Sequence, residues 1–111
     1  MLNLWATWCA PCVAEMPTLD ALAARQKQVK VLAVSQDVAG QEAGVAAFFS
    51  ERKLASLEAY QDPEMALMER IEVDTLPTTI LFDRDGKEVW RVVGALDWNG
   101  REAAKLIGEA D

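Results

Sequence analysis

The sequence contains no histidine and only two cysteines. The missing histidine excludes triads and general bases built on imidazole, and it removes the commonest zinc ligand. Two cysteines are too few for a disulfide framework or for an all-cysteine zinc site within one chain. No metal site is therefore expected, and any covalent chemistry would have to use the cysteine pair.

Positive charge is also scarce, because 11 Lys and Arg face 18 Asp and Glu and the net charge is −7. This balance, with no basic run, argues against nucleic acid or an anionic membrane surface as a partner. No apolar run approaches the roughly 20 residues of a membrane-spanning helix. No signal peptide precedes the first strand-like segment.

Apolar residues are plentiful: 51% of the 111 residues are hydrophobic, which is enough for the core of one domain spanning residues 1–111. Short apolar runs alternate with amphipathic stretches, a pattern that predicts an α/β fold. Strands are expected at residues 1–6, 29–35, 56–61, 78–83 and 88–93. Helices are expected at about 10–27, 41–54 and 63–71, and after Asn99.

Two of these helices carry start signals. Asp62 is a capping residue followed by Pro63 at the first helical position, and Asn99 has Glu102 three residues later, as in a capping box. The buried faces of the two helices are expected to consist of Met65, Met68 and Ile71 in the first, and of Ala103, Leu106, Ile107 and Ala110 in the second.

The segment Cys9-Ala10-Pro11-Cys12 lies where a buried strand meets an amphipathic helix. A thiol at a helix N-terminus faces unpaired N–H groups, which favour its thiolate. Cys12 lies one turn deeper, so Cys9 is expected to attack a disulfide and Cys12 to resolve the mixed disulfide. A structural disulfide, or a zinc site shared between two chains, is the alternative. A two-residue loop gains little from a disulfide, and one chain offers no further thiolate or imidazole ligand.

Several separated segments resemble the thioredoxin superfamily, and within it the TlpA/ResA-like thiol–disulfide oxidoreductases. They are Leu4 to Cys12, Glu15-Met16-Pro17, Thr75 to Thr79 with the following ILFD and Asp85-Gly86, and Gly94-Ala95. The resemblance implies a thioredoxin-like three-layer fold with helices on both faces of a mixed sheet. Parallel strands and a C-terminal antiparallel hairpin form this sheet, with one inserted helix–strand unit at 41–61. The expected strand order is 56–61, 29–35, 1–6, 78–83, 88–93, with the two outer segments at the edges.

The resemblance also implies how substrate is held. Pro77 matches the family's cis-proline, and Leu76 before it would offer its backbone to an extended substrate. From the residues alone, an ordinary trans proline at the start of an edge strand is the alternative. The remaining substrate contacts implied by the family are Trp8, Ala10, Pro11, Gly94 and Ala95.

A different group of residues bears on proton transfer and on structure. Asn3 stands where thioredoxin has a buried acid, six residues before the first cysteine, and Asn cannot titrate. Glu15, one turn after Cys12, is then the candidate third catalytic residue and would handle protons from a half-buried position. A solvated first-turn acid is its alternative reading. Asn3, Trp5 and Pro17 are expected to be structural, with Pro17 kinking the first helix.

The expected activity is reduction of protein disulfides, with no cofactor beyond the Cys9–Cys12 disulfide. Protein disulfides or dithiols are the expected partners of a monomer, which a membrane electron donor would re-reduce. The family implies a periplasmic or envelope-facing location and a role in redox homeostasis and cytochrome c maturation, while a cytoplasmic location stays open. Family members normally carry another strand and an anchor before the first strand here, so an N-terminal truncation is expected. A disulfide donor, a peroxidase of the peroxiredoxin group and a non-catalytic binding module are the alternatives.

Overall fold

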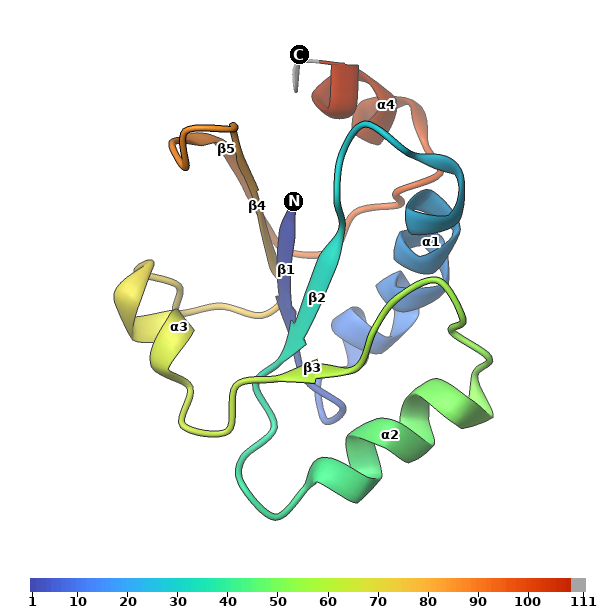
Figure 1. Cartoon of the computed structure of the whole chain (residues 1–111), viewed down its shortest axis with the longest axis vertical. Coiled ribbons are helices and arrows are strands. Elements are labelled where there is room, and N and C mark those ends of the chain that lie inside the picture. The colour runs from blue at the N-terminus through green and yellow to red at the C-terminus, as the bar shows by residue number, and fades with distance from the viewer. Residues whose placement is uncertain (109–111) are drawn as a thin grey trace.

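Apolar and β-branched runs form five strands, and the amphipathic segments between them form four helices within residues 1–108, which the computed structural model describes (Figure 1). The elements in chain order are β1 (Leu2–Trp5), α1 (Ala10–Arg25), β2 (Leu32–Ser35), α2 (Glu42–Glu51), β3 (Tyr60–Gln61), α3 (Ala66–Arg70), β4 (Thr78–Phe82), β5 (Glu88–Val93) and α4 (Arg101–Gly108).

The strands form one sheet in the order β3-β2-β1-β4-β5, as the sequence predicts. β1 pairs in parallel with β2, and β2 with β3, whereas β4 runs antiparallel to both β1 and β5. The chain moves from β1 outward to β3, so right-handed crossovers put α1 and α2 on the same face. Figure 1 shows α3 on the opposite side of the sheet from α1 and α4, which makes three layers.

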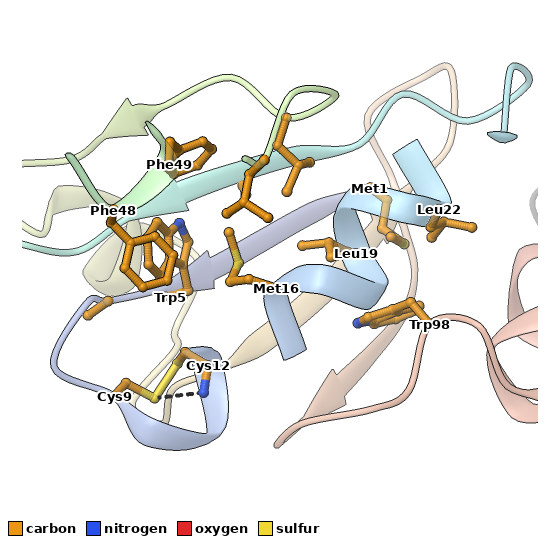
Figure 2. Packing of buried hydrophobic residues seen from close by; sticks show 14 of the residues in the cluster. Met1, Trp5, Cys9, Cys12, Met16, Leu19, Leu22, Phe48, Phe49 and Trp98 are labelled. Atoms are coloured by element: carbon orange, nitrogen blue, oxygen red, sulfur yellow. Dashed lines mark hydrogen bonds between the residues drawn. A yellow bond between two sulfur atoms is a disulfide. The ribbon is translucent and has the colours of Figure 1, made fainter. Parts of the chain in front are cut away.

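Alternation of side chains along the strands divides the core between the two faces. Trp5 of β1 is fully buried on the α1 side, and its ring lies 4.9 Å from that of Phe48 and 5.7 Å from that of Phe49 in α2 (Figure 2). The neighbouring Leu4 points to the other face, where it packs in a smaller cluster with Ile80 and other apolar residues. The sheet is therefore covered on both sides, as a mostly apolar β1 predicts.

The inserted unit and the third helix are shorter than expected. β3 consists of two residues instead of the six expected at 56–61. The third helix begins at Ala66, not at Pro63, although the Asp62 carboxylate does accept hydrogen bonds from the backbone N–H groups of Ala66 (3.2 Å) and Leu67 (2.8 Å). Asp62 therefore caps the helix across an intervening turn. This helix buries none of its residues fully, because it lies at the margin of the smaller cluster.

The last helix begins differently from the capping-box prediction. It begins at Arg101, and the Gly100 carbonyl accepts the first helical hydrogen bond, from the N–H of Ala104. The Asn99 side chain instead accepts a hydrogen bond of 2.5 Å from Arg25 at the end of α1. Arg25, which is distant in sequence, thus binds the side chain that the local sequence pattern predicted to cap the helix. Ala103 and Ile107 are buried as predicted, Leu106 is half-buried, and Ala110 lies outside the described residues.

No helix in residues 1–108 has both the length and the apolar character needed to cross a bilayer.

The core assignment predicts unequal effects for two apolar truncations in the β4–β5 hairpin. Ile80 is fully buried, whereas Val89 is 42% exposed. Ile80→Ala should lower the free energy of unfolding by about 2–5 kcal/mol, since it removes methyl groups and leaves a cavity. Val89→Ala, the matched control, should cost less than about 1 kcal/mol. Urea unfolding measures both, and equal losses would contradict the assignment of Ile80 to the core.

Candidate active site

The sheet topology brings three chain segments to one end of the sheet. β1 and β2 run in parallel and end there, while the antiparallel β4 begins there, since Leu4 pairs with both Val34 and Thr78. The loop that follows β1 carries Cys9, and Pro77 immediately precedes β4. Cys9 and Pro77, which are 68 residues apart in sequence, thereby lie at the same end of the sheet. Open α/β sheets usually bind ligands at the ends of their strands.

Cys9 and Cys12 form a disulfide at the first turn of α1, with their Cα atoms 5.2 Å apart (Figure 2). Cys9 is the N-cap residue of α1, and its sulfur accepts a hydrogen bond of 3.3 Å from the backbone N–H of Cys12. The backbone there is helical because Pro11 is favoured in a first helical turn. The sulfur of Cys9 therefore lies at the positive end of the helix dipole.

The two cysteines differ in exposure in the predicted direction. Cys9 is 7% exposed and Cys12 is fully buried. Ala10 and Pro11 between them are exposed, and the preceding Trp8 is 67% exposed. An incoming molecule would therefore meet Trp8 and the Ala10-Pro11 pair and reach the sulfur of Cys9 before that of Cys12.

The predicted segments around Pro77 and Gly94 are adjacent in space. The Leu76–Pro77 peptide bond is cis, as the family resemblance implies. The carbonyl of the buried Pro77 accepts a hydrogen bond of 2.8 Å from the N–H of Gly94. Gly94 follows β5 with a φ of +98°, a conformation that residues with a side chain rarely adopt. Leu76 is half-buried and Ala95 is exposed, so part of this surface is open to solvent.

The carboxylate of Glu15 in α1 accepts three hydrogen bonds. One carboxylate oxygen accepts a hydrogen bond from the Asn3 amide at 3.0 Å. The other accepts hydrogen bonds from the Leu96 N–H at 2.9 Å and from the Trp98 indole at 3.0 Å. The Asn3 amide also donates to the hydroxyl of Thr79 at 2.9 Å. Asn3 thus links β1, α1 and β4.

Glu15 is 3% exposed, and therefore buried and not half-buried as expected from the sequence. Burial raises the pKa of Glu15 above its usual range, because the charged carboxylate loses its hydration. The hydrogen bonds from Leu96, Asn3 and Trp98 act in the opposite direction and only partly offset burial. The alternative of a solvated first-turn acid is thus wrong: a buried carboxyl group with a raised pKa lies one turn after Cys12.

Sequence reasoning missed part of this network. Trp98 has no assigned role in the sequence analysis, yet it is 1% exposed, stacks on Trp90 at 6.1 Å and donates to Glu15. Its only sequence signal is a large aromatic residue in an otherwise polar turn, just before a helix. The contribution of Leu96 comes from its backbone, which no side-chain pattern could reveal.

The other residues singled out from sequence have simpler surroundings. Trp5 is fully buried in the core, as predicted, and Pro17 lies inside α1 on its exposed side. Within residues 1–108, no cluster of three or more His, Cys, Asp or Glu side chains is arranged to hold a metal ion.

A CxxC disulfide at the N-terminus of a helix, next to a cis-proline that leads into an antiparallel strand, defines a thioredoxin-fold protein. The chain belongs to the Redoxin family, whose family model matches residues 1–107. Its curated relatives support the TlpA/ResA-like branch predicted from the sequence. It is 34% identical over 84% of its length to a thiol-disulfide oxidoreductase ResA from Bacillus cereus, and 38% identical over 86% to one from Oceanobacillus iheyensis.

Solved structures agree with the fold. A pneumococcal exposed lipoprotein thioredoxin, Etrx1 from Streptococcus pneumoniae, superimposes with a TM-score of 0.82 at 26% identity, over 97% of this chain and 82% of that one. StoA from Bacillus subtilis gives a TM-score of 0.73 at 25% identity, over 98% and 78%. The match covers 53% of the Bacillus cereus ResA and 50% of the Oceanobacillus iheyensis ResA, so the chain spans about half the length of the curated relatives it matches.

The raised pKa of Glu15 predicts how stability depends on pH. Folding favours the protonated carboxyl group of Glu15. Its contribution to the free energy of unfolding is therefore complete below about pH 4.3 and is lost as the pH rises through the raised pKa. The free energy of unfolding of the native protein, relative to that of Glu15→Gln, should therefore fall across this interval. Urea unfolding from about pH 4 to about pH 8 measures it.

Glu51→Gln, at an exposed position in α2, controls for the loss of one negative charge. A difference between native protein and Glu15→Gln that is constant, or that grows with pH, would contradict the raised pKa of Glu15.

Proposed function

We propose that the protein is a thiol–disulfide oxidoreductase that reduces disulfides in other proteins. The observation that carries the proposal is the unequal exposure of two cysteines at one helix N-terminus: Cys9 is 7% exposed, whereas Cys12 is fully buried. The similarity to proteins named thiol-disulfide oxidoreductase ResA supports it. The reaction requires no cofactor other than the Cys9–Cys12 pair.

In the reduced protein, the Cys9 thiolate attacks one sulfur of the substrate disulfide. A mixed disulfide forms between Cys9 and the substrate, and the other substrate sulfur leaves as a thiolate that takes up a proton. Cys12 then loses its proton and attacks the sulfur of Cys9, which releases the second substrate thiol and forms the Cys9–Cys12 disulfide. Two electrons pass to the substrate. N–H groups at the start of α1, including that of Cys12, favour the attacking thiolate.

Glu15 is the proposed proton acceptor for Cys12. Both side chains are buried, and Glu15 follows Cys12 by three residues, which places the two on neighbouring turns of the same face of α1. The raised pKa of Glu15 brings its proton affinity closer to that of a thiol. A surface depression of about 230 Å³, lined by Glu15, Thr18, Leu96 and their neighbours, offers a path for protons to solvent.

The substrate segment is proposed to lie across this end of the sheet, where Trp8, Ala10, Pro11 and Ala95 are exposed. Trp8, Ala10 and Pro11 flank the attacking sulfur on one side. Leu76, Pro77, Gly94 and Ala95 come together on the other side through the Gly94–Pro77 hydrogen bond. An extended chain bound there would pair with the backbone of Leu76, as a strand adds to a sheet edge.

The cellular setting is proposed from the relatives. The pneumococcal structure is described as an exposed lipoprotein, which supports an envelope-facing or periplasmic location. There, a membrane electron donor would reduce the Cys9–Cys12 disulfide after each turnover, and cytochrome c maturation would be one process served. The chain is proposed to act as a monomer, because both cysteines of the reaction come from one copy.

Two single substitutions separate the proposed roles of the cysteines. Cys9→Ser should abolish reduction of a protein disulfide, since no thiolate remains at the surface. Cys12→Ser should still attack but should accumulate the mixed disulfide, because nothing displaces the substrate from Cys9. Mass spectrometry of the trapped adduct and a thiol-release assay check both. Full activity of Cys9→Ser, or an adduct trapped by Cys9→Ser in place of Cys12→Ser, would overturn the assignment.

The reduction potential decides the direction of electron flow. A reductase should equilibrate in dithiothreitol or glutathione buffers near the thioredoxin value of about −270 mV. A potential near about −120 mV would instead identify a disulfide donor, the alternative function. The gap of about 150 mV corresponds to roughly 7 kcal/mol for two electrons and is easily resolved. A Cys9–Cys12 pair that does not exchange in any of these buffers would favour a non-catalytic binding module.

A further inference from the structure

A second buried carboxylate, Asp37, lies at the same end of the sheet and has no part in the chemistry described above. It comes two residues after β2 and is 3% exposed. One carboxylate oxygen accepts a hydrogen bond of 2.5 Å from the Thr7 hydroxyl. The other accepts one of 3.0 Å from the Thr7 backbone N–H and another from the Ser35 hydroxyl.

Asp37 is itself held firmly. Its backbone N–H donates to the Ser35 hydroxyl at 2.9 Å, and its carbonyl accepts from the Gln61 side chain at 2.9 Å. Ser35 ends β2 and Gln61 ends β3. The carboxylate is therefore anchored to two parallel strands and reaches from them to the loop that follows β1.

Thr7 lies in the middle of the loop between β1 and α1. It precedes Cys9 by two residues, and the N–H of Cys9 donates to the carbonyl of Ala6 at 3.2 Å, which closes a tight turn around Thr7 and Trp8. Both hydrogen-bond donors of Thr7, its backbone N–H and its hydroxyl, bind the same carboxylate. Fixing Thr7 thus fixes the turn from which Trp8 projects and on which Cys9 enters α1.

We propose that Asp37 is a positioning residue for the attacking cysteine: through Thr7 it holds the turn before α1 so that the Cys9 sulfur keeps its place against the helix N-terminus. The role serves the reaction assigned under the proposed function and rests on it. Asp37 does not take part in bond making. Its effect is on geometry, and a displacement of about 1 Å at a reacting atom can cost two orders of magnitude in rate.

The chemistry of the network requires a carboxylate. Asp37 accepts hydrogen bonds from three donors on two oxygens. An asparagine has one acceptor oxygen and an amide that only donates, so at least one donor from Thr7 or Ser35 would face another donor. Thr7→Val removes the hydroxyl while keeping the shape and the backbone bond, and Thr7→Ser keeps the hydroxyl.

The experiment measures the attack of Cys9 in the Cys12→Ser background, where one thiol is left in the chain. The probe is a small aromatic disulfide that releases a coloured thiolate as the mixed disulfide with Cys9 forms. Asp37→Asn should slow the second-order rate about tenfold or more, and Thr7→Val severalfold, while Thr7→Ser should keep most of the rate.

Asp20→Ala, which removes the accepting oxygen, is the control for destabilisation. Asp20 likewise accepts backbone N–H groups across a loop, those of Ser56 at 2.9 Å and Leu57 at 3.0 Å, but it belongs to α1 more than two turns beyond the cysteines. It should lose stability in urea unfolding and react with the probe at the rate of the parent. Asp37→Asn should differ in rate as well as in stability, each rate being measured on protein shown to be folded by circular dichroism.

Rates of Asp37→Asn and Thr7→Val within twofold of the parent would overturn the positioning role. So would a loss in Thr7→Ser as large as in Thr7→Val, or an equal loss in Asp20→Ala, since either would mean a general effect of destabilisation. If the native protein reacts with the small disulfide but fails to reduce protein disulfides, the proposed function fails while the positioning of Cys9 by Asp37 stands.

Discussion

The burial of one carboxylate, Glu15, constrains the arrangement of the whole α1 side of the molecule. A buried carboxylate is tolerated only where donors surround it, and here the donors come from β1 through Asn3 and from the loop after β5 through Leu96 and Trp98. Elements distant in sequence must therefore meet at one point on α1. The same contacts join α1, whose first turn carries the cysteines, to β1 and to the loop after β5.

The end of the sheet that holds the disulfide is organised by polar contacts between loops. Asp37 binds Thr7 on one side of the cysteines, and the Pro77 carbonyl binds the Gly94 N–H on the other. Loops have little apolar surface to bury, so directional hydrogen bonds decide their conformation. The exposed Trp8 and Cys9, which is 7% exposed and belongs to the core cluster, are then held in a defined relation.

Elements with a strong local sequence pattern were predicted well, and those with a weak pattern were predicted poorly. The bounds of β4 and β5 and the buried Trp5 follow from apolar runs and their alternation, whereas the strand order follows from the family resemblance. The two-residue β3 and the late start of α3 do not, because few apolar contacts support them. Asn99 shows the limit of local rules: its capping pattern is sound, but Arg25, 74 residues away, binds its side chain.

The sequence by itself determined the fold class, the position of the cysteine pair at a strand–helix junction and the family, because these depend on periodicity and on residues close together in the chain. Only the tertiary structure decided that Glu15 is buried, that Trp98 binds it, and that Asp37 holds the turn before Cys9. These contacts join residues 30 to 83 positions apart. The packing of the sheet and helices decides which residues make these contacts. The spacing of residues along the chain does not reveal them.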